Sequence, residues 1–303
     1  MKQANAKKLI PALIIGIFCV NPTFAADNVK NEKKTFYANG QLQSVYTYED
    51  ERKNGDFKIF DKNGNLLDYG VFKDDKLLDD NKNPFTGPRK VFYINGQLNS
   101  ETNYSHGVRQ GTAATYYETG KILSQLNFEN GIVEGKYQEF YESGNPRVVG
   151  SIKNGAYDGE IRNYYEDGKL QAINYYKNGL RDGVGKEFYR NGNTFIESNF
   201  RNDEPSGEHK EYFENGRIRF ERFLDKGKEN GVVKEYFENG NIKKKWTMEN
   251  GEKAGEFIEN YENGKVKIIA QYRNDSKHGE YREYAVDGSL IKKERFRKGK
   301  KLE

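Results

Sequence analysis

The sequence predicts an all-β protein, an elongated single-layer antiparallel β-meander of about eleven 24-residue hairpin repeats. The main observation is a glycine that recurs in one phase along the chain, with nine of the ten intervals equal to 24 residues and one equal to 32. A second glycine follows 15 residues after most members of this series. So strict a period is typical of a repeat array. The first-phase glycines are Gly40, Gly64, Gly96, Gly120, Gly144, Gly168, Gly192, Gly216, Gly240, Gly264 and Gly288.

Alternating residues within each unit predict β-strands. In 170–176, Leu170, Ala172 and Tyr176 would share one face of a strand, with Ile173 and Tyr175 on the other. Asn-Gly or Asp-Gly dipeptides end the strands, as in Asn178-Gly179 and Asn191-Gly192. These dipeptides readily adopt the positive φ angles of tight hairpin turns, so each unit is expected to be strand, turn, strand, turn.

The N-terminal segment does not belong to the array. Three lysines precede an apolar run from Leu9 to Val20, which predicts a signal peptide over residues 1–25. Residues 26–35 are then expected to be a linker, and residues 36–303 the repeat array. Cys19, the only cysteine, lies in the signal peptide. The protein is therefore expected to be exported, to the periplasm, the cell surface or the medium.

The mature chain is close to electrically neutral. Its formal charge falls from +4 to +1 because Lys2, Lys7 and Lys8 leave with the signal peptide. Non-specific nucleic-acid binding depends on an excess of Lys and Arg, so no nucleic-acid partner is expected. The stability of a chain so rich in charge must come from its 22 Tyr and 19 Phe residues.

The one long interval indicates an insertion of eight residues near 74–88. Insertions in repeat proteins usually emerge as loops at one edge. A surface loop is favoured, and a docking element is the alternative.

No motif for catalysis, metal binding or cofactor binding is recognised. His106, His209 and His278 fall at three different repeat positions, so they share no ligand geometry. The sequence has no Gly-x-Ser-x-Gly elbow, and no phosphate-binding loop. A glutamate does recur at one repeat position, which indicates a solvated or cross-strand-paired row rather than a unique active site. This row is Glu139, Glu187, Glu211, Glu235, Glu259 and Glu283.

A pair of adjacent aromatic residues ends the second strand of most units. Adjacent residues point to opposite faces of a sheet, so one member is expected to pack inward and the other to be exposed. The expected exposed row is Phe60, Phe92, Tyr116, Phe140, Tyr164, Phe188, Tyr212, Tyr236 and Tyr284. Its members Phe140, Tyr164, Phe188, Tyr212 and Tyr236 are the candidate binding residues for an extended partner. The alternative is that both aromatic rows only pack against neighbouring side chains.

The last residues are strongly basic, with Lys292, Lys293, Arg295, Arg297 and Lys298 among them. Such a run can be a solvated end of the sheet, where charge discourages edge-to-edge pairing. A contact with acidic lipid or polysaccharide is the alternative.

The repeat resembles the bacterial variant of the MORN repeat found in proteins labelled YwqK-type antitoxins. The matching residues are Tyr164-Tyr165-Glu166-Asp167-Gly168-Lys169-Leu170, Tyr176-Lys177-Asn178-Gly179 and Asp158-Gly159-Glu160. Asp203 and Asp275 replace a glycine of the pattern, and Asn260 breaks the aromatic pair. The resemblance implies a twisted single-layer sheet and a scaffold that binds protein or oligomerises.

The expected function is therefore a non-enzymatic exported scaffold that binds a protein or another extended polymer. One alternative is a binder of membrane lipid or polysaccharide that uses the basic end. Another is an antitoxin-like neutralising partner, which fits an exported chain poorly because a cytoplasmic toxin would be out of its reach.

Overall fold

The computed structural model describes residues 30–302 as β-strands joined by turns. The chain divides into two compact units. Among the described residues, the first unit comprises 30–120 and 127–133, and the second comprises 121–126 and 134–302. The predicted signal peptide, 1–25, lies outside the described residues.

The first five strands form a sheet of their own, in chain order. Their bounds are β1 (Asn31–Phe36), β2 (Leu42–Glu49), β3 (Arg52–Phe60), β4 (Leu66–Lys73) and β5 (Lys76–Leu77). Strand β1 pairs with β2, so the array begins at Asn31, inside the segment expected to be a linker. The first unit continues with β6 (Gly87–Phe92), β7 (Leu98–Ser105) and β8 (Val108–Tyr116).

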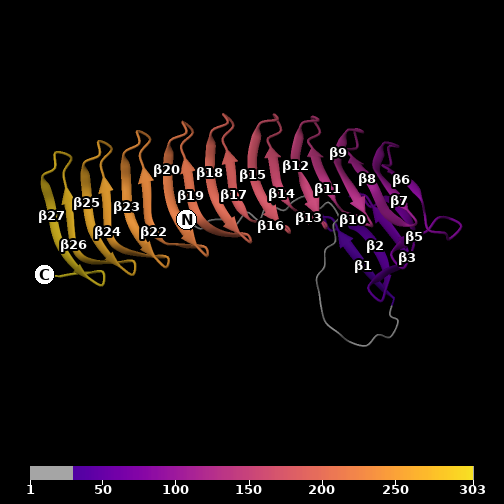
Figure 1. Ribbon diagram of the computed structural model, residues 1–303, viewed down its shortest axis with the longest axis horizontal. Helices are drawn as coiled ribbons and strands as arrows, with labels where there is room; N and C mark the ends of the chain where they lie inside the picture. The colour runs from indigo at the N-terminus through magenta and orange to yellow at the C-terminus, as the bar shows by residue number, and fades with distance from the viewer. Residues whose placement is uncertain (1–29, 303) are drawn as a thin grey trace. The chain divides into compact units, whose positions relative to one another are not determined.

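In the second unit, hairpins follow one another in a row of curved strands, from β12 to β27 in Figure 1. This confirms the predicted meander of antiparallel hairpins. The strands that follow β8 are β9 (Ile122–Glu129), β10 (Ile132–Val133), β11 (Gly135–Phe140), β12 (Pro146–Lys153), β13 (Ala156–Tyr157), β14 (Gly159–Tyr164), β15 (Leu170–Lys177), β16 (Leu180–Arg181), β17 (Gly183–Phe188), β18 (Thr194–Arg201), β19 (Glu204–Tyr212), β20 (Ile218–Asp225), β21 (Lys228–Glu229), β22 (Gly231–Tyr236), β23 (Ile242–Glu249), β24 (Glu252–Asn260), β25 (Val266–Arg273), β26 (Ser276–Tyr284), β27 (Leu290–Arg297) and β28 (Lys300–Lys301).

The two turns of each repeat differ, although both contain an Asn-Gly or similar dipeptide. In the turn between β15 and β16, Asn178 (φ 51°) and Gly179 (φ 82°) both have positive φ, as a two-residue hairpin requires. In the turn between β17 and β18, only Gly192 (φ 93°) does, and its N–H donates to the carbonyl oxygen of Tyr189. The expectation of one tight turn type is therefore correct for Asn178-Gly179 and wrong for Asn191-Gly192, where a longer turn leads into a bulge.

That bulge shifts the register at the start of each following strand. Glu139 lies opposite Val148 while Phe140 lies opposite Pro146, so Arg147 is the extra residue of β12. Bulges re-aim side chains. The same shift recurs at β23, where Lys243 is the extra residue.

One face of the sheet carries the core, and we call it the packed face. Ile161, Val233 and Ala270 are buried there. The residues directly before and after each of them in the strand point to the other face and are exposed or half-buried. At some positions of this face a glycine lies beside a large side chain, as Gly185 does beside Phe200. A Cβ added to Gly150 would lie 2.2 Å from Ile161 Cδ1, so the glycine makes room for the isoleucine of the next hairpin. The opposite side of the sheet is the outer face.

Hydrogen bonds between successive repeats account for the strict period. The hydroxyl of the second aromatic of one pair donates to the carbonyl oxygen 23 residues later, as in Tyr141 to Tyr164 (2.8 Å) and Tyr189 to Tyr212 (2.7 Å). At the other edge, the N–H of Gly179 donates to the carbonyl oxygen of Tyr157. A change in repeat length would break these bonds, because each spans a fixed number of residues.

The insertion is largely a surface loop, as expected, with residues 80–84 and 86 exposed. Phe85 is half-buried, and its ring packs edge-on against Tyr104 at 5.8 Å. Leu77, which is 0% exposed and whose N–H donates to the carbonyl oxygen of Gly107, lies in β5 at the repeat position of Val133 and belongs to the repeat. Only Phe85 therefore supplies an apolar contact from the insertion to the first unit.

Candidate functional site

The five candidate binding residues lie at the ends of five strands of the second unit, one in each of five successive repeats. They are Phe140 in β11, Tyr164 in β14, Phe188 in β17, Tyr212 in β19 and Tyr236 in β22. We call these five residues the aromatic row. All five are half-buried rather than exposed. Of the nine residues expected to be exposed, Phe92 alone is, at 50%. The rings therefore present part of their surface and pack with the rest.

Charged side chains lie beside the aromatic row on the outer face. Tyr236 Oη and Lys234 Nζ each donate to Glu221 Oε1 at 2.7 Å. Burial, and then the hydrogen bond to Glu221, raise the pKa of Tyr236. Basic residues likewise precede Tyr164 and Phe188 by two positions, and they pair with Glu160 (2.6 Å) and Glu197 (3.0 Å). Each of these hairpins thus offers a ring beside a balanced pair of charges.

The recurrent glutamates lie on the packed face, opposite the aromatic row. Four of them pair with the basic residue that the bulge re-aims, eight positions later: Glu139 with Arg147 (2.6 Å), Glu211 with Arg219, Glu235 with Lys243 (2.8 Å) and Glu259 with Lys267 (3.0 Å). Cross-strand pairing, one of the two expectations for this row, is confirmed for these four. Ion pairing stabilises them in place, which fits a structural role.

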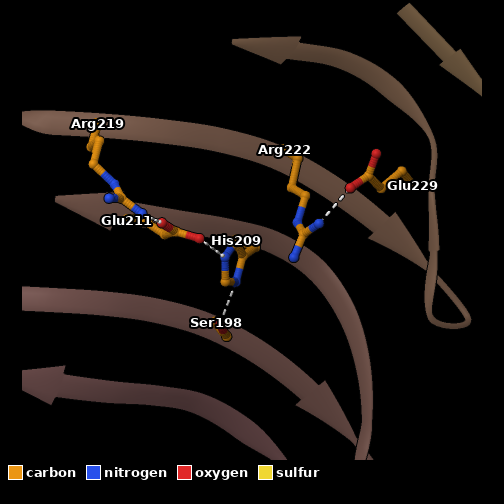
Figure 2. Close-up of polar contacts among 6 residues, drawn as sticks. All are labelled: Ser198, His209, Glu211, Arg219, Arg222 and Glu229. Carbon is orange, nitrogen blue, oxygen red and sulfur yellow. Dashed lines mark hydrogen bonds and ion pairs between the residues drawn. The ribbon is translucent and has the colours of Figure 1, made fainter. Parts of the chain in front are cut away.

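A polar cluster on the packed face joins three strands, β18, β19 and β20 (Figure 2). Ser198 Oγ lies 2.6 Å from His209 Nδ1, and His209 Nε2 lies 3.4 Å from Glu211 Oε1. Glu211 also pairs with Arg219. The hydrogen bond from His209, and then the one from Arg219, lower the pKa of Glu211 to about 2.

Hydroxyl, imidazole and carboxylate are the groups of nucleophilic catalysis, although the sequence alone suggests no such candidate. Ser198 is 7% exposed in the middle of its strand, so its hydroxyl has little access to a substrate. The cluster was missed because Ser198 and His209 are joined only by the register of β18 and β19, which places them opposite each other. Its geometry suits a structural link better than a reaction.

Arg222 extends this cluster on the same face. It lies opposite His209 in the ladder and pairs with Glu229, which precedes β22 (Figure 2). Its guanidinium also lies 5.5 Å from the centre of the Phe220 ring. The cation thereby covers an aromatic ring of the packed face.

The basic end of the array is partly neutralised. Lys292 pairs with Glu294 at 3.1 Å, and Lys293 with Glu280 at 3.7 Å. Arg295, Arg297 and Lys298 are exposed. The paired Lys292 and Lys293 are exposed as well, so all five predicted basic residues lie on the surface.

Neither metal-binding groups nor membrane-spanning helices occur in residues 30–302. No three His, Cys, Asp or Glu side chains of this part of the chain are grouped as metal ligands. No helix long and apolar enough to cross a membrane is found among the same residues.

Known proteins were compared with the chain. A family model described as the MORN repeat variant matches nine segments: 31–50, 85–106, 109–130, 133–154, 157–178, 181–202, 205–225, 229–250 and 253–274. No curated protein matches in sequence.

Among solved structures, one match is a pore form of the Photorhabdus luminescens Tc holotoxin, with 10% identity and a TM-score of 0.19 over 86% of this chain and 17% of that one. A second is the crystal structure of TcdB2-TccC3-TEV, with 12% identity and a TM-score of 0.19 over 89% of this chain and 19% of that one. The chain thus spans less than a fifth of the length of these proteins.

The repeat match covers more than half of the chain, in phase with the glycine period and with the hairpins of the structure. The chain therefore belongs to the MORN repeat variant family.

Proposed function

We propose that this protein is an exported scaffold, without enzymatic activity, that binds an extended segment of a partner protein along its aromatic row. MORN repeats are generally binding or scaffold repeats, which supports the general class. The observation that carries the proposal is a half-buried ring at the same position of five successive hairpins, with a charged pair beside four of the rings, those of Tyr164, Phe188, Tyr212 and Tyr236.

The spacing of this surface favours an extended partner. Equivalent residues in successive hairpins are two strand spacings apart, or about 10 Å. An extended chain advances about 3.3 Å per residue, so every third residue of a segment crossing the hairpins would meet an equivalent ring. The bonds between repeats, such as Tyr165 Oη to the carbonyl oxygen of Phe188 (3.0 Å), hold the rings in this spacing.

Two synthetic peptides of the same composition test the proposal. One carries its apolar residues at every third position, and the other carries the same number of apolar residues at every second position. The first is expected to bind the protein more tightly in a fluorescence anisotropy titration. The triple variant Tyr164→Ala, Phe188→Ala and Tyr212→Ala should lose most of this binding, because interface aromatics typically contribute about 2 kcal/mol each.

The matched control changes exposed aromatics of the same face that lie outside the row, Tyr175→Ala with Phe223→Ala. This variant should bind as the unchanged protein does. Equal binding of both peptides, or equal loss in both variants at unchanged thermal stability, would contradict the proposal.

A further inference from the structure

The hydrogen-bonded ladder is interrupted between β4 and β6. In the second unit, the eight-residue strand of one repeat pairs with the next long strand along the chain, as Ile173 of β15 pairs with Lys186 of β17. The equivalent residues of the first unit are Tyr69 in β4, 104 positions before Ile173, and Lys90 in β6, 96 positions before Lys186. Within residues 30–302 this pair does not form, and β1 to β5 make a separate sheet. Most of β4 therefore has an open edge.

Side chains occupy the main-chain groups of that edge. The N–H of Tyr69 donates to Asp68 Oδ1 at 2.9 Å, and its carbonyl oxygen accepts from Arg89 Nη2. Asp68 and Arg89 pair with each other at 2.7 Å. The N–H and C=O of one residue point the same way in a strand, so this ion pair takes the place of a missing neighbouring strand.

Large apolar side chains are exposed on both sides of the interruption. Tyr69 is 68% exposed, and Val71 is also exposed. Phe92 in β6 is the exposed member of a series that is elsewhere half-buried. The repeats provide the comparison for Phe92, because the equivalent rings of the other repeats are half-buried where the sheet is continuous. Exposed apolar side chains beside an open edge are typical of an interaction site.

We propose that the edge of β4 is a docking site at which an extended segment of a partner protein adds a strand, displacing the Asp68–Arg89 pair. Strand addition uses main-chain bonds for affinity and alternate side chains for specificity. The segment would carry apolar residues at every second position, to cover Tyr69 and Val71. This site does not depend on the aromatic row, which lies in the second unit.

Charge indicates what the segment carries and argues against a second copy of this chain. Lys58 and Lys73 are exposed on the same face as Tyr69, whereas Asp56 is the one exposed carboxylate of that face in β3 and β4. Lys90, across the interruption in β6, is exposed as well and pairs with Glu101 at 3.7 Å. Two β4 edges paired with each other would bring the lysines of both copies together. We therefore expect the partner segment to carry carboxylates beside its apolar residues.

A nine-residue peptide that alternates Val with Thr and has Glu at both ends is the probe. Its control has the same sequence with N-methylated amides at alternate residues, which removes main-chain donors from one edge. Only the unmethylated peptide should bind, and it should slow amide hydrogen exchange over 66–71. The double change Asp68→Ala and Arg89→Ala frees both groups of Tyr69 and should tighten binding about tenfold.

The change Tyr69→Ser with Val71→Ser should weaken binding of the probe more than tenfold, because two apolar side chains would lose their cover. Its control is Tyr175→Ser with Val232→Ser, which alters residues of similar size on continuous parts of the sheet. Three results would overturn the proposal: no binding by the protein or by the double variant, equal binding of the methylated peptide, or equal loss in the control. A dimer in sedimentation that Tyr69→Ser with Val71→Ser abolishes would instead assign the edge to a second copy.

Discussion

The hydroxyl of Tyr165 donates a hydrogen bond of 3.0 Å to the carbonyl oxygen of Phe188, which belongs to the next hairpin. The bond ties the turn of one repeat to the strand end of the following one. Tyr37, Tyr93, Tyr141, Tyr189 and Tyr261 make the same bond, each to the carbonyl oxygen 23 residues later. The second aromatic of the pair therefore stabilises the array, while the first has only part of its ring engaged.

Removing one of these hydroxyls should weaken the array without altering its surface. Tyr165→Phe deletes the donor and leaves the carbonyl oxygen of Phe188 half-buried, so we expect a loss of about 1 kcal/mol in the free energy of unfolding. Urea denaturation measures the effect. The control is Tyr175→Phe. The hydroxyl of Tyr175 donates to the Glu160 side chain, and Tyr175 is exposed, so removing this hydroxyl should change stability less.

The opposite change should strengthen the array. Phe213 stands at the repeat position of Tyr165, so Phe213→Tyr places a hydroxyl within reach of the carbonyl oxygen of Tyr236, 23 residues later. We expect a gain of about 0.5–1 kcal/mol. A decrease in stability would show that the ring at this repeat is not placed as the tyrosines are.

The carboxylate of Asp203 replaces a glycine of the repeat and adds a bond. Asp203 has φ 66°, and its Oδ1 accepts the N–H of Arg181 at 2.9 Å. Asp203→Ala keeps the unfavourable φ and loses the bond, so it should cost about 2 kcal/mol. Asp203→Gly loses the bond but relieves the φ strain, and should cost less. Thermal unfolding of the two variants is the measurement, and equal losses would contradict this account of the position.

Glu211 should make stability depend on acid pH. Its pKa in the folded protein, about 2, lies below the ordinary value of 4.5 because His209 and Arg219 bond the carboxylate. A depressed pKa contributes stability above the unfolded value that is lost as pH falls from about 4.5 toward 2, amounting to at most about 3 kcal/mol. Glu211→Gln should flatten this part of the stability profile in urea titrations. A matched Glu214→Gln variant, in an exposed turn, should keep it.

Lys53 should make the stability of the protein depend on pH in the alkaline range. Burial first, and then the nearby charge of Arg109, lower its pKa to about 8. Between about 8 and the ordinary lysine value, the unfolded chain binds more protons, so stability should rise with pH. Lys53→Met should remove this rise between pH 8 and 9.5, and Lys58→Met, at an exposed position of the same strand, should retain it. A rise that persists in Lys53→Met would assign it to another group.

The sequence by itself determined the hairpin array. Turn dipeptides such as Asn178-Gly179 and the alternation in 170–176 are local signals, because φ preference and strand period depend on neighbouring residues alone. A fixed period then requires that equivalent residues meet in successive repeats, so the rows of aromatics and glutamates follow from the sequence alone.

Tertiary structure alone decided which surfaces are covered. The exposure of Phe92 results from a missing strand pair between β4 and β6, and the burial of Leu77 from packing within the first unit. The bulge that brings Arg147 onto Glu139, and the register that places Ser198 opposite His209, likewise follow from strand pairing. Burial and cross-strand contact depend on residues distant in the chain, and a repeat pattern specifies their order but not the points at which the pairing is interrupted.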